Sequence, residues 1–584
     1  MKSFTISLLF LLVFRFSSFA QQLPFSPSNI SLPQLAYSAS AWGDFDHDGD
    51  LDLALTGAEG NNPVTKILRN DNGTFTEAAT GFDLHYGSVE WGDINHDGDL
   101  DLLATGIDMT GVPYTWVMLN VGGSFAFFGV PFPGVMDGQA TFGDVNNDGS
   151  LDVLLAGSSM VRIYQNDGTG IFDSIHAGLP NLEAAVCSWV DYNNDGQSDV
   201  FISGNTGGGI ISKLYQNNHG VFTEVTITPE PFAGLYGGQA KWADLDNDGD
   251  QDLVIAGTDL YVDGHFIFYR NDGNGQFTKF EYPEASLLNP FFDLADYNAD
   301  GLIDVALIGT IPGCGGPPAT LLLKNTGSFV FNTVSTLIPG YKLGAVSWGD
   351  YNNDGYSDLL LTGMDAFDVP KTTLYLNNLG DTSYVSSNTP PTTPGSLTVT
   401  LQSDKAILHW GSAGDSRTPK NGLSYNIRIG TQPDNSDILS PLASVSDGSR
   451  LVAAMGNTTT DTSYFLTGIP NGTYYFSVQA IDNGFRAGTF ASPCMFSYST
   501  VGIQNAGKDL GISFSPNPCH DYVTIRQSSS ADVNSRIKII YESGQCFYEG
   551  IVPDDLDISK WPKGLYLVQN LNSKELTSAR FIKN

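Results

Sequence analysis

Seven segments of the chain repeat a nine-residue pattern of polar residues, D-x-[DN]-x-D-G-x-x-D, whose side chains are suited to holding a metal ion. The pattern starts at residues 44, 93, 144, 191, 244, 296 and 350. Carboxylate or amide oxygens stand at positions 1, 3, 5 and 9, and the glycine at position 6 permits a sharp turn. Ca²⁺ prefers oxygen ligands of this kind, in flexible sets of six to eight. The pattern therefore predicts one calcium ion in each repeat.

The predicted ligands are the residues at positions 1, 3, 5, 7 and 9, with position 7 acting through its backbone carbonyl. They are Asp44, Asp46, Asp48, Asp50 and Asp52; Asp93, Asn95, Asp97, Asp99 and Asp101; Asp144, Asn146, Asp148, Ser150 and Asp152; Asp191, Asn193, Asp195, Gln197 and Asp199; Asp244, Asp246, Asp248, Asp250 and Asp252; Asp296, Asn298, Asp300, Leu302 and Asp304; and Asp350, Asn352, Asp354, Tyr356 and Asp358.

Charge repulsion favours a metal site over the alternative, a metal-free turn. The seven segments hold 26 of the 63 acidic residues. Two unit charges about 4 Å apart repel by about 1 kcal/mol even in bulk water. An Asn-Gly or Asp-Gly pair would be enough for a turn. An EF-hand is excluded because position 12 is apolar in every repeat, from Leu55 to Leu361, where an EF-hand needs glutamate.

The segments around each acidic loop predict an all-β repeat fold. The repeats recur every 47 to 54 residues, which is typical of a four-stranded propeller blade. In the fifth repeat, strand-like runs at 239–242, 253–256 and 265–269 precede a fourth near Phe277. One blade cannot bury both of its faces, so blades must stack around an axis. The loop then lies between the first and second strands.

The sequence also predicts where the tryptophans before the loops, the histidines within the loops and the N-terminal segment lie. We expect the aromatic residues before the loops, Trp42, Trp91, Trp189, Trp242 and Trp348, to pack between blades. The histidines at position 4, His47 and His96, should point outward into solvent. The segment at Phe25 resembles the fourth strand of other repeats, so it is expected to complete the last blade and close the ring.

The repeats resemble the FG-GAP/VCBS family, which includes the repeat of the integrin α-chain propeller. The resemblance covers roughly residues 24–385 and rests on all seven copies of the loop. It implies a seven-bladed propeller over residues 21–385 with one calcium loop per blade, about seven ions in all. The sixth copy departs from the others at Leu294 and Ala299, but neither change removes a ligand.

Two smaller β-sandwich modules are predicted after the propeller. A Pro/Thr-rich linker at 386–394 leads into residues 395–502, which resemble a fibronectin type III domain through an early Trp410 and the segment GTYYFSVQA at 472–480. Residues 508–584 resemble a type A sorting domain of the type IX secretion system of Bacteroidota. Pro516-Asn517-Pro518, KGLYLV at 563–568 and a basic end carry that resemblance. It implies passage through the type IX secretion machinery.

Composition and export signals limit the function classes. The 584-residue chain has a formal net charge of -36, so nucleic acid and anionic lipid are unsuitable partners. Residues 1–20 have the layout of a secretory signal peptide, and no later apolar run is long enough to span a membrane. We therefore expect a secreted or outer-surface protein. The five cysteines form no CxxC pair; Cys519 and Cys546 could pair.

These features predict a calcium-binding propeller that mediates adhesion or recognition of an extracellular glycan or protein. The chain between the second and third strands varies among repeats, for example at 107–114, 258–263 and 311–318, and variable loops on a rigid scaffold often carry recognition. Two alternatives remain open: a propeller-based polysaccharide-degrading enzyme, and a structural surface component without a discrete ligand. No GxSxG or HExxH motif is present, so we predict no catalytic residue, no organic cofactor and no enzyme.

Overall fold

The structure is a computed structural model in which almost all described elements are β-strands. It describes residues 23–379, 389–498 and 512–583, with gaps at 82, 131, 196, 314–315, 355, 403–404, 417, 419, 444–447, 449, 453–455, 459–461, 468, 483–484, 516–521, 528–535, 542–544, 552, 554 and 571–577. The predicted signal peptide and residues 386–388 of the predicted linker lie outside these residues. Among the described residues, no helix is long and apolar enough to cross a membrane.

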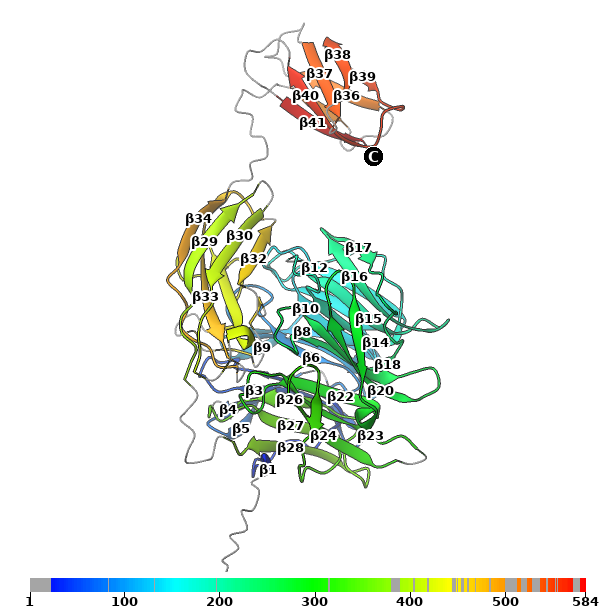
Figure 1. Cartoon of the computed structure of the whole chain (residues 1–584), viewed down its shortest axis with the longest axis vertical. Helices are drawn as coiled ribbons and strands as arrows, with labels where there is room; N and C mark the ends of the chain where they lie inside the picture. Colours follow the sequence, from blue (N-terminus) through cyan, green and yellow to red (C-terminus); the bar gives the residue numbers. More distant parts are fainter. Residues whose placement is uncertain are drawn as a thin grey trace, which may run out of the picture. The chain divides into compact units, whose positions relative to one another are not determined.

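Residues 25–377 form seven four-stranded antiparallel sheets, which we call blades 1 to 7 (Figure 1). In chain order they are β2 (Ala36–Gly43), β3 (Asp52–Glu59), β4 (Asn62–Asp71) and β5 (Thr74–Thr80); β6 (Val89–Gly92), β7 (Asp101–Ile107), β8 (Pro113–Val121) and β9 (Ser124–Phe128); β10 (Gln139–Gly143), β11 (Asp152–Gly157), β12 (Met160–Asn166) and β13 (Phe172–Ile175); β14 (Glu183–Val190), β15 (Asp199–Asn205), β16 (Ile210–Asn218) and β17 (Val221–Glu224); β18 (Tyr236–Ala243), β19 (Asp252–Thr258), β20 (Gly264–Asn271) and β21 (Phe277–Glu281); β22 (Leu288–Ala295), β23 (Asp304–Thr310), β24 (Pro318–Asn325) and β25 (Phe331–Thr333); and β26 (Val346–Gly349), β27 (Asp358–Met364) and β28 (Pro370–Asn377), completed by β1 (Phe25–Pro27).

The acidic loop joins the first and second strands of each blade. In blade 1, Gly43 at the end of β2 pairs with Asp52 at the start of β3. In blade 7, Gly349 pairs with Asp358 in the same way. The nine-residue pattern therefore forms the whole connection and ends on the first residue of the second strand. The predicted placement of the loop between two strands is confirmed.

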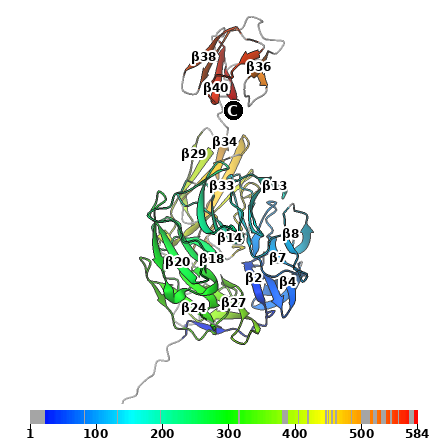
Figure 2. The ribbon, with the colours of Figure 1, turned by 90° about the vertical axis from the view of Figure 1, so that its right-hand side faces the viewer.

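The N-terminal strand closes the ring, as the sequence predicts. β1 pairs antiparallel with β28, with Phe25 opposite Asn377, so both ends of the repeat region meet in blade 7. Phe25 is buried, and its ring centroid lies 5.6 Å from that of Tyr297 and 5.7 Å from that of Trp348. The ring is therefore closed both by backbone pairing of β1 with β28 and by aromatic contacts of Phe25. Figure 2 shows the propeller strands from a second direction.

The tryptophans before the loops pack against glycines of the neighbouring blade. A Cβ placed on Gly43 would lie 2.8 Å from the Trp91 ring, and one on Gly349 would lie 2.8 Å from the Trp42 ring. These two glycines directly precede position 1 of their loops, and a residue without a side chain lets the next blade approach closely at these places. The predicted packing of the tryptophans between blades is confirmed at these contacts.

Residues 395–498 form a β-sandwich, which we call the middle domain. One sheet contains β29 (Gly395–Leu401), β30 (Lys405–Gly411) and β32 (Ser463–Thr467); the other contains β31 (Ser424–Gly430), β33 (Gly472–Ile481) and β34 (Cys494–Tyr498). In β33, Tyr474, Phe476 and Val478 alternate along the strand and are buried, because alternate side chains share one face of a sheet. The assignment of the middle domain as fibronectin type III-like stays a prediction.

The C-terminal residues form a separate compact unit. Its sheets contain β35 (Ile512–Ser515), β36 (Tyr522–Gln527) and β39 (Asp555–Asp557), and β37 (Arg536–Tyr541), β38 (Cys546–Ile551), β40 (Gly564–Asn570) and β41 (Ser578–Lys583). Val523, Ile537 and Tyr566 lie in its core. Cys546 is a free, exposed cysteine; its candidate partner Cys519 lies outside the described residues.

Candidate metal centres

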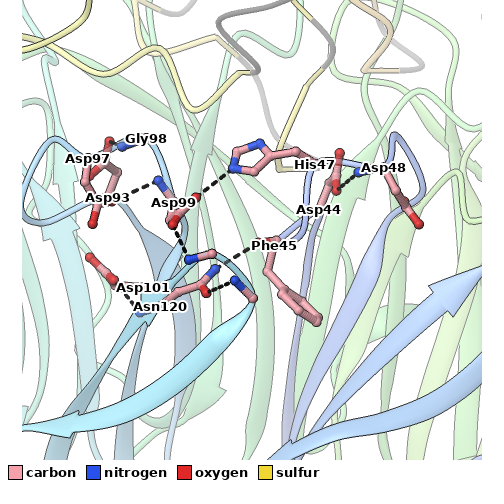
Figure 3. A network of polar contacts seen from close by, with 12 residues as sticks. Asp44, Phe45, His47, Asp48, Asp93, Asp97, Gly98, Asp99, Asp101 and Asn120 are labelled. Carbon is pink, nitrogen blue, oxygen red and sulfur yellow. Dashed lines mark hydrogen bonds and ion pairs between the residues drawn. The ribbon is translucent and has the colours of Figure 1, made fainter.

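The first carboxylate of each loop organises the turn that follows it. In blade 1, the Asp44 carboxylate accepts hydrogen bonds from the backbone N–H of Asp48, at 3.1 Å, and of Gly49, at 3.0 Å. The Asp48 carboxylate accepts the N–H of Asp50 at 2.9 Å. The glycine has a φ of 91°, in the left-handed region that suits glycine. The backbone thus wraps around the carboxylates and turns them toward one another (Figure 3).

The aspartate at position 9 ties the loop to the sheet behind it. One oxygen of Asp52 accepts the N–H of Phe45 at 3.0 Å, and the other accepts the N–H of Asn70 in β4 at 2.7 Å. Asp101 makes the equivalent bonds to Ile94 and Asn120. Each carboxylate oxygen has two lone pairs, so these bonds leave acceptor capacity free for a cation. Position 9 is therefore both a structural residue and a candidate ligand.

The loops with aspartate at position 3 bring three carboxylates together. Ligand atoms of Asp44, Asp46 and Asp48 all lie within 4.8 Å of one another, and so do those of Asp244, Asp246 and Asp252. Five other loops have asparagine at position 3, whose amide oxygen can also bind Ca²⁺.

Buried carboxylate oxygens without a hydrogen-bond partner also fit a cation. Among the described residues, such oxygens occur at Asp46, Asp93, Asp199, Asp246 and Asp358, at positions 1, 3 and 9 of their loops. A buried acceptor without a partner is costly. A divalent cation would satisfy these atoms, so the residues present fit calcium.

Burial makes the loop carboxylates hard to ionise in the absence of a cation. Burial chiefly, with a smaller contribution from the neighbouring loop acids, raises the pKa of Asp44 to about 6 and that of Asp52 to about 8. The pKa of Asp304 in blade 6 rises to about 9 for the same main reason. Desolvation and like charge both disfavour the ionised form, and a bound cation reverses both effects.

In the sixth loop, a cationic side chain lies close to one predicted ligand: Lys324 in β24 forms an ion pair with Asp300 at 2.9 Å. In the first loop, Arg69 is more distant from Asp46, at 3.9 Å. The amide of Asn298 donates to Asp304 at 2.8 Å. This loop therefore presents less free negative charge than the loops of blades 1 and 5, which the sequence pattern of the loop itself does not show.

Side chains at position 4 link neighbouring loops. His47 Nε2 lies 3.0 Å from Asp99 Oδ1 in the loop of blade 2 (Figure 3). Asn194 donates to Asp250 and Asn353 to Asp50, both at 2.8 Å. His47 is exposed, as the sequence predicts, and in addition it reaches the next loop, because position 4 has a left-handed backbone that aims its side chain there.

A ring of seven buried asparagines, which the sequence reasoning missed, holds each loop to the next blade. Each donates from its side-chain amide to the carbonyl at position 2 of the preceding loop, at 2.7 to 2.9 Å. They are Asn70, Asn120, Asn166, Asn217, Asn271, Asn325 and Asn377. The available signal was an asparagine 14 to 21 residues after each position-9 aspartate.

The first strands of the blades surround a central cavity of about 1040 Å³. The charged residues that line it are Glu90, Asp137, Asp191, Lys241 and Asp293. Lys241 pairs with Asp293 at 2.5 Å, while Glu90 accepts the N–H of Phe142 and Asp293 that of Trp348, each in the next blade. Burial raises the pKa of Glu90 to about 7. These bonds join neighbouring blades, which gives Glu90, Lys241 and Asp293 a structural role.

Family models match both parts of the chain that carry recognisable patterns. The FG-GAP-like repeat matches residues 44–104, 144–202, 191–255, 244–307 and 296–361. The secretion system C-terminal sorting domain matches residues 513–584. No curated protein matches the chain.

Solved structures with similar folds share little sequence with the chain. The BP39L lectin from Burkholderia pseudomallei is 12% identical, with a TM-score of 0.41; the match covers 59% of this chain and 97% of that one. The Aleuria aurantia lectin is 10% identical, with a TM-score of 0.32; the match covers 53% of this chain and 99% of that one. The extracellular domain of a putative hybrid two-component system from B. thetaiotaomicron is 11% identical, with a TM-score of 0.37. That match covers 81% of this chain and 57% of the other.

The acidic loops, the antiparallel blades and the two family matches agree with one another. The sorting domain directs its protein through the type IX secretion system to the outside of the cell, in bacteria of the Bacteroidota. This chain is therefore an exported β-propeller protein that contains FG-GAP-like repeats and a type IX secretion C-terminal sorting domain.

Proposed function

We propose that the protein is a calcium-stabilised propeller that recognises an extracellular glycan or protein through the face opposite its metal loops. The observation that carries this proposal is a set of exposed apolar side chains on the turns between the second and third strands. Leu260 and Tyr261 in blade 5 and Phe367 in blade 7 are 72%, 82% and 86% exposed. Large apolar groups held in solvent favour a binding role when they gather on one face.

Strand direction places these turns away from the metal loops. In blade 5, β19 starts at Asp252, which is position 9 of the loop, and ends at Thr258, next to the exposed turn. A seven-residue strand is about 23 Å long, so the turn and the loop lie at opposite ends of the blade. The same order holds for Asp358 and the turn at Phe367 in blade 7. A ligand at the turns would therefore leave the metal loops uncovered.

Short hydrogen-bonded turns hold the exposed groups in fixed positions. The Asp259 carboxylate accepts the N–H of Tyr261 and of Asp263, both at 2.9 Å. Asp365 accepts the N–H of Phe367 at 2.8 Å and of Val369 at 3.1 Å. A rigid aromatic side chain loses little conformational entropy on binding, which favours its use in recognition.

Calcium supports this function by holding the loops that connect the blades. When bound, the ion supplies positive charge that offsets the repulsion among the loop carboxylates. Asp46 and Asp246, with their buried oxygens, and the aspartates at positions 1 and 9 would hold it. The chain's own residues then transmit this order: position 4 reaches the next loop, and the buried asparagines reach the preceding one.

Binding to arrays of glycans and extracellular proteins tests the recognition proposal. The double variant Tyr261→Ser, Phe367→Ser should lose binding to the strongest target by at least about tenfold, as expected for central aromatic contacts. The matched control is Val330→Ser, because Val330 is exposed but lies between β24 and β25, at the metal-loop end of blade 6. Equal binding by the double variant and the wild type would contradict the proposed face.

We propose that the protein is not an enzyme; one observation bears on the alternative of a polysaccharide-degrading enzyme. Glu90 and Asp293 line the same cavity, and paired carboxyl groups are the usual catalysts of glycoside hydrolysis. Turnover of a polysaccharide that is lost in Glu90→Gln without loss of folding would support the alternative. Coating of cells without binding to any array target would instead favour a structural surface component.

A further inference from the structure

The middle domain lies on the metal loop of blade 1. The carbonyl of Leu451 accepts a hydrogen bond from the N–H of Asp44 at 2.6 Å, and Val452 forms an isolated antiparallel bridge with Gly43. Asp44 is position 1 of its loop. The segment of the middle domain thus extends the end of β2 where the loop begins.

The loops of blades 2 and 3 make equivalent contacts. The Tyr464 hydroxyl donates to Asp144 Oδ2 at 3.4 Å. The Ser440 side chain lies near Asp93. Both aspartates are at position 1. The carbonyl of Ile438 lies so near Gly149 that a Cβ added there would be 1.8 Å from its oxygen. The middle domain therefore contacts the first carboxylate residue of three consecutive loops.

Apolar contacts complete this docking surface. Leu451 and Val452 are buried in one hydrophobic cluster with Phe45 and Leu100. Phe45 is position 2 of the first loop, and Leu100 is position 8 of the second. The cluster that contains the apolar part of the surface thus includes residues of two metal loops, so its shape depends in part on their conformation.

Docking also covers part of the central cavity. Leu442, Val452 and Phe485 of the middle domain line the cavity together with the first strands of the blades. The middle domain therefore covers part of the cavity. Release of the middle domain would uncover that part.

We propose that the middle domain docks more tightly when the loops of blades 1 to 3 hold their calcium ions, so that metal binding and covering of the cavity are coupled. This inference rests on the calcium part of the proposed function. The physical reason is that an ion draws the carboxylates of a loop together, whereas repulsion among them opens it. The residues that the middle domain contacts, Asp44, Asp93 and Asp144, are the first carboxylates of those loops.

Coupling of this kind is reciprocal. If calcium tightens docking, docking must strengthen calcium binding in the same three loops by the same factor. The loop of blade 5 gives an internal comparison, because its described contacts are with the propeller itself: Asn194 reaches Asp250, and Asn325 reaches the carbonyl of Leu245. Blades 1 and 5 also both have five acidic residues in the loop.

Hydrogen exchange of the full-length chain, read by mass spectrometry for each loop, tests the first direction. Calcium should slow exchange in residues 438–464 of the wild type. Asp48→Ala, in the loop of blade 1, should remove that protection. Asp248→Ala, in the loop of blade 5, is the matched control and should keep it. Both variants change position 5 of a loop that has aspartate at positions 1, 3, 5, 7 and 9. Equal protection of residues 438–464 in these two variants would overturn the proposal.

The second direction uses variants that leave every loop acid in place. Val452→Gln weakens docking without adding charge, and Leu401→Gln is the control at an exposed position of the same domain. The calcium concentration that half-protects the loops at 44–52, 93–101 and 144–152 should rise about fivefold in Val452→Gln, at the lower end of typical coupling. It should stay the same for the loop at 244–252. An unchanged concentration for the first three loops would contradict coupling.

The same data separate failure of this inference from failure of the calcium proposal. Calcium protection of the loop at 244–252 without any effect on residues 438–464 would reject coupled docking and keep the metal sites. Absence of calcium protection in all seven loops of the wild type would reject both.

Discussion

At the scale of single residues, the buried asparagines show how one side chain can join two blades. Asn271 donates to the carbonyl of Tyr192 at 2.7 Å in the preceding blade and to that of Gln251 at 3.2 Å in its own. Its side-chain oxygen accepts the N–H of Gly273 at 3.1 Å. Every polar atom of this buried amide is therefore used, which is the condition for polar groups in a protein core.

Replacing this asparagine should be costly. Asn271→Ala leaves two carbonyls of the loops without their donor, and each lost partner costs about 1–3 kcal/mol. We expect a loss of about 2–4 kcal/mol in the free energy of unfolding, measured by urea titration. Asn62→Ala is the control, because Asn62 is exposed at the start of β4. Similar stability of both variants would show that the ring of asparagines is not important.

The loop carboxyls give a pH dependence with a definite sign. Burial raises the pKa of Asp52, Asp101 and Asp252 to about 8 in the folded, metal-free protein, against about 3.9 in an unfolded chain. Unfolding between these values releases protons, so these groups make the metal-free fold less stable as pH rises from about 4 to about 8.

Thermal unfolding of metal-free protein at pH 5 and pH 8 measures this effect. The midpoint should be lower at pH 8, and added calcium should restore most of the loss, because the ion favours the ionised carboxylates. A metal-free midpoint that is equal or higher at pH 8 would mean that these carboxyls ionise freely in the folded protein.

At the scale of elements, the strand β1, although only three residues long, closes the ring of blades. It supplies the fourth strand of blade 7 and places Phe25 between Tyr297 and Trp348. Without it, β28 would become an exposed edge with unpaired backbone groups. Ring closure therefore depends on the N-terminal residues of the repeat region.

Phe25→Ala tests the contribution of this closure. Truncation of a buried phenylalanine typically lowers the free energy of unfolding by about 3–5 kcal/mol. In this variant, hydrogen exchange of the backbone amides in β28 should become faster than in the third strands of the other blades. Hydrogen exchange in β28 and β20 gives the comparison within one molecule. If β28 exchanges no faster than β20 in the variant, the closing strand does not hold blade 7.

The sequence predicted the repeated local features of the propeller and missed contacts between distant residues. The loops, the four strands of a blade and the closing role of Phe25 were predictable because each local pattern recurs along the chain. The bridge from Asn271 to Tyr192 was not, because its two partners are separated by 79 residues. The contact of Tyr464 with Asp144 has no repeated pattern at all and spans 320 residues.

At the scale of the whole molecule, the blades are joined around the ring both along their first strands and at the metal-loop ends. Each loop is bonded to the following strand through position 9 and to the next blade through a buried asparagine, and several reach a neighbouring loop through position 4. Order in one loop therefore supports its neighbours. For that reason we expect calcium to stabilise the propeller as a unit and not one blade at a time.

Thermal unfolding of the full-length protein in millimolar Ca²⁺ and in EDTA, with counting of bound metal, tests the central claim most directly. At ten times the dissociation constant, each bound ion would add about 1.4 kcal/mol to the stability of the fold. We predict a higher unfolding midpoint for the propeller in calcium, together with several bound ions per chain. The same midpoint in both conditions with no bound metal would contradict the account and leave the acidic loops as turns only.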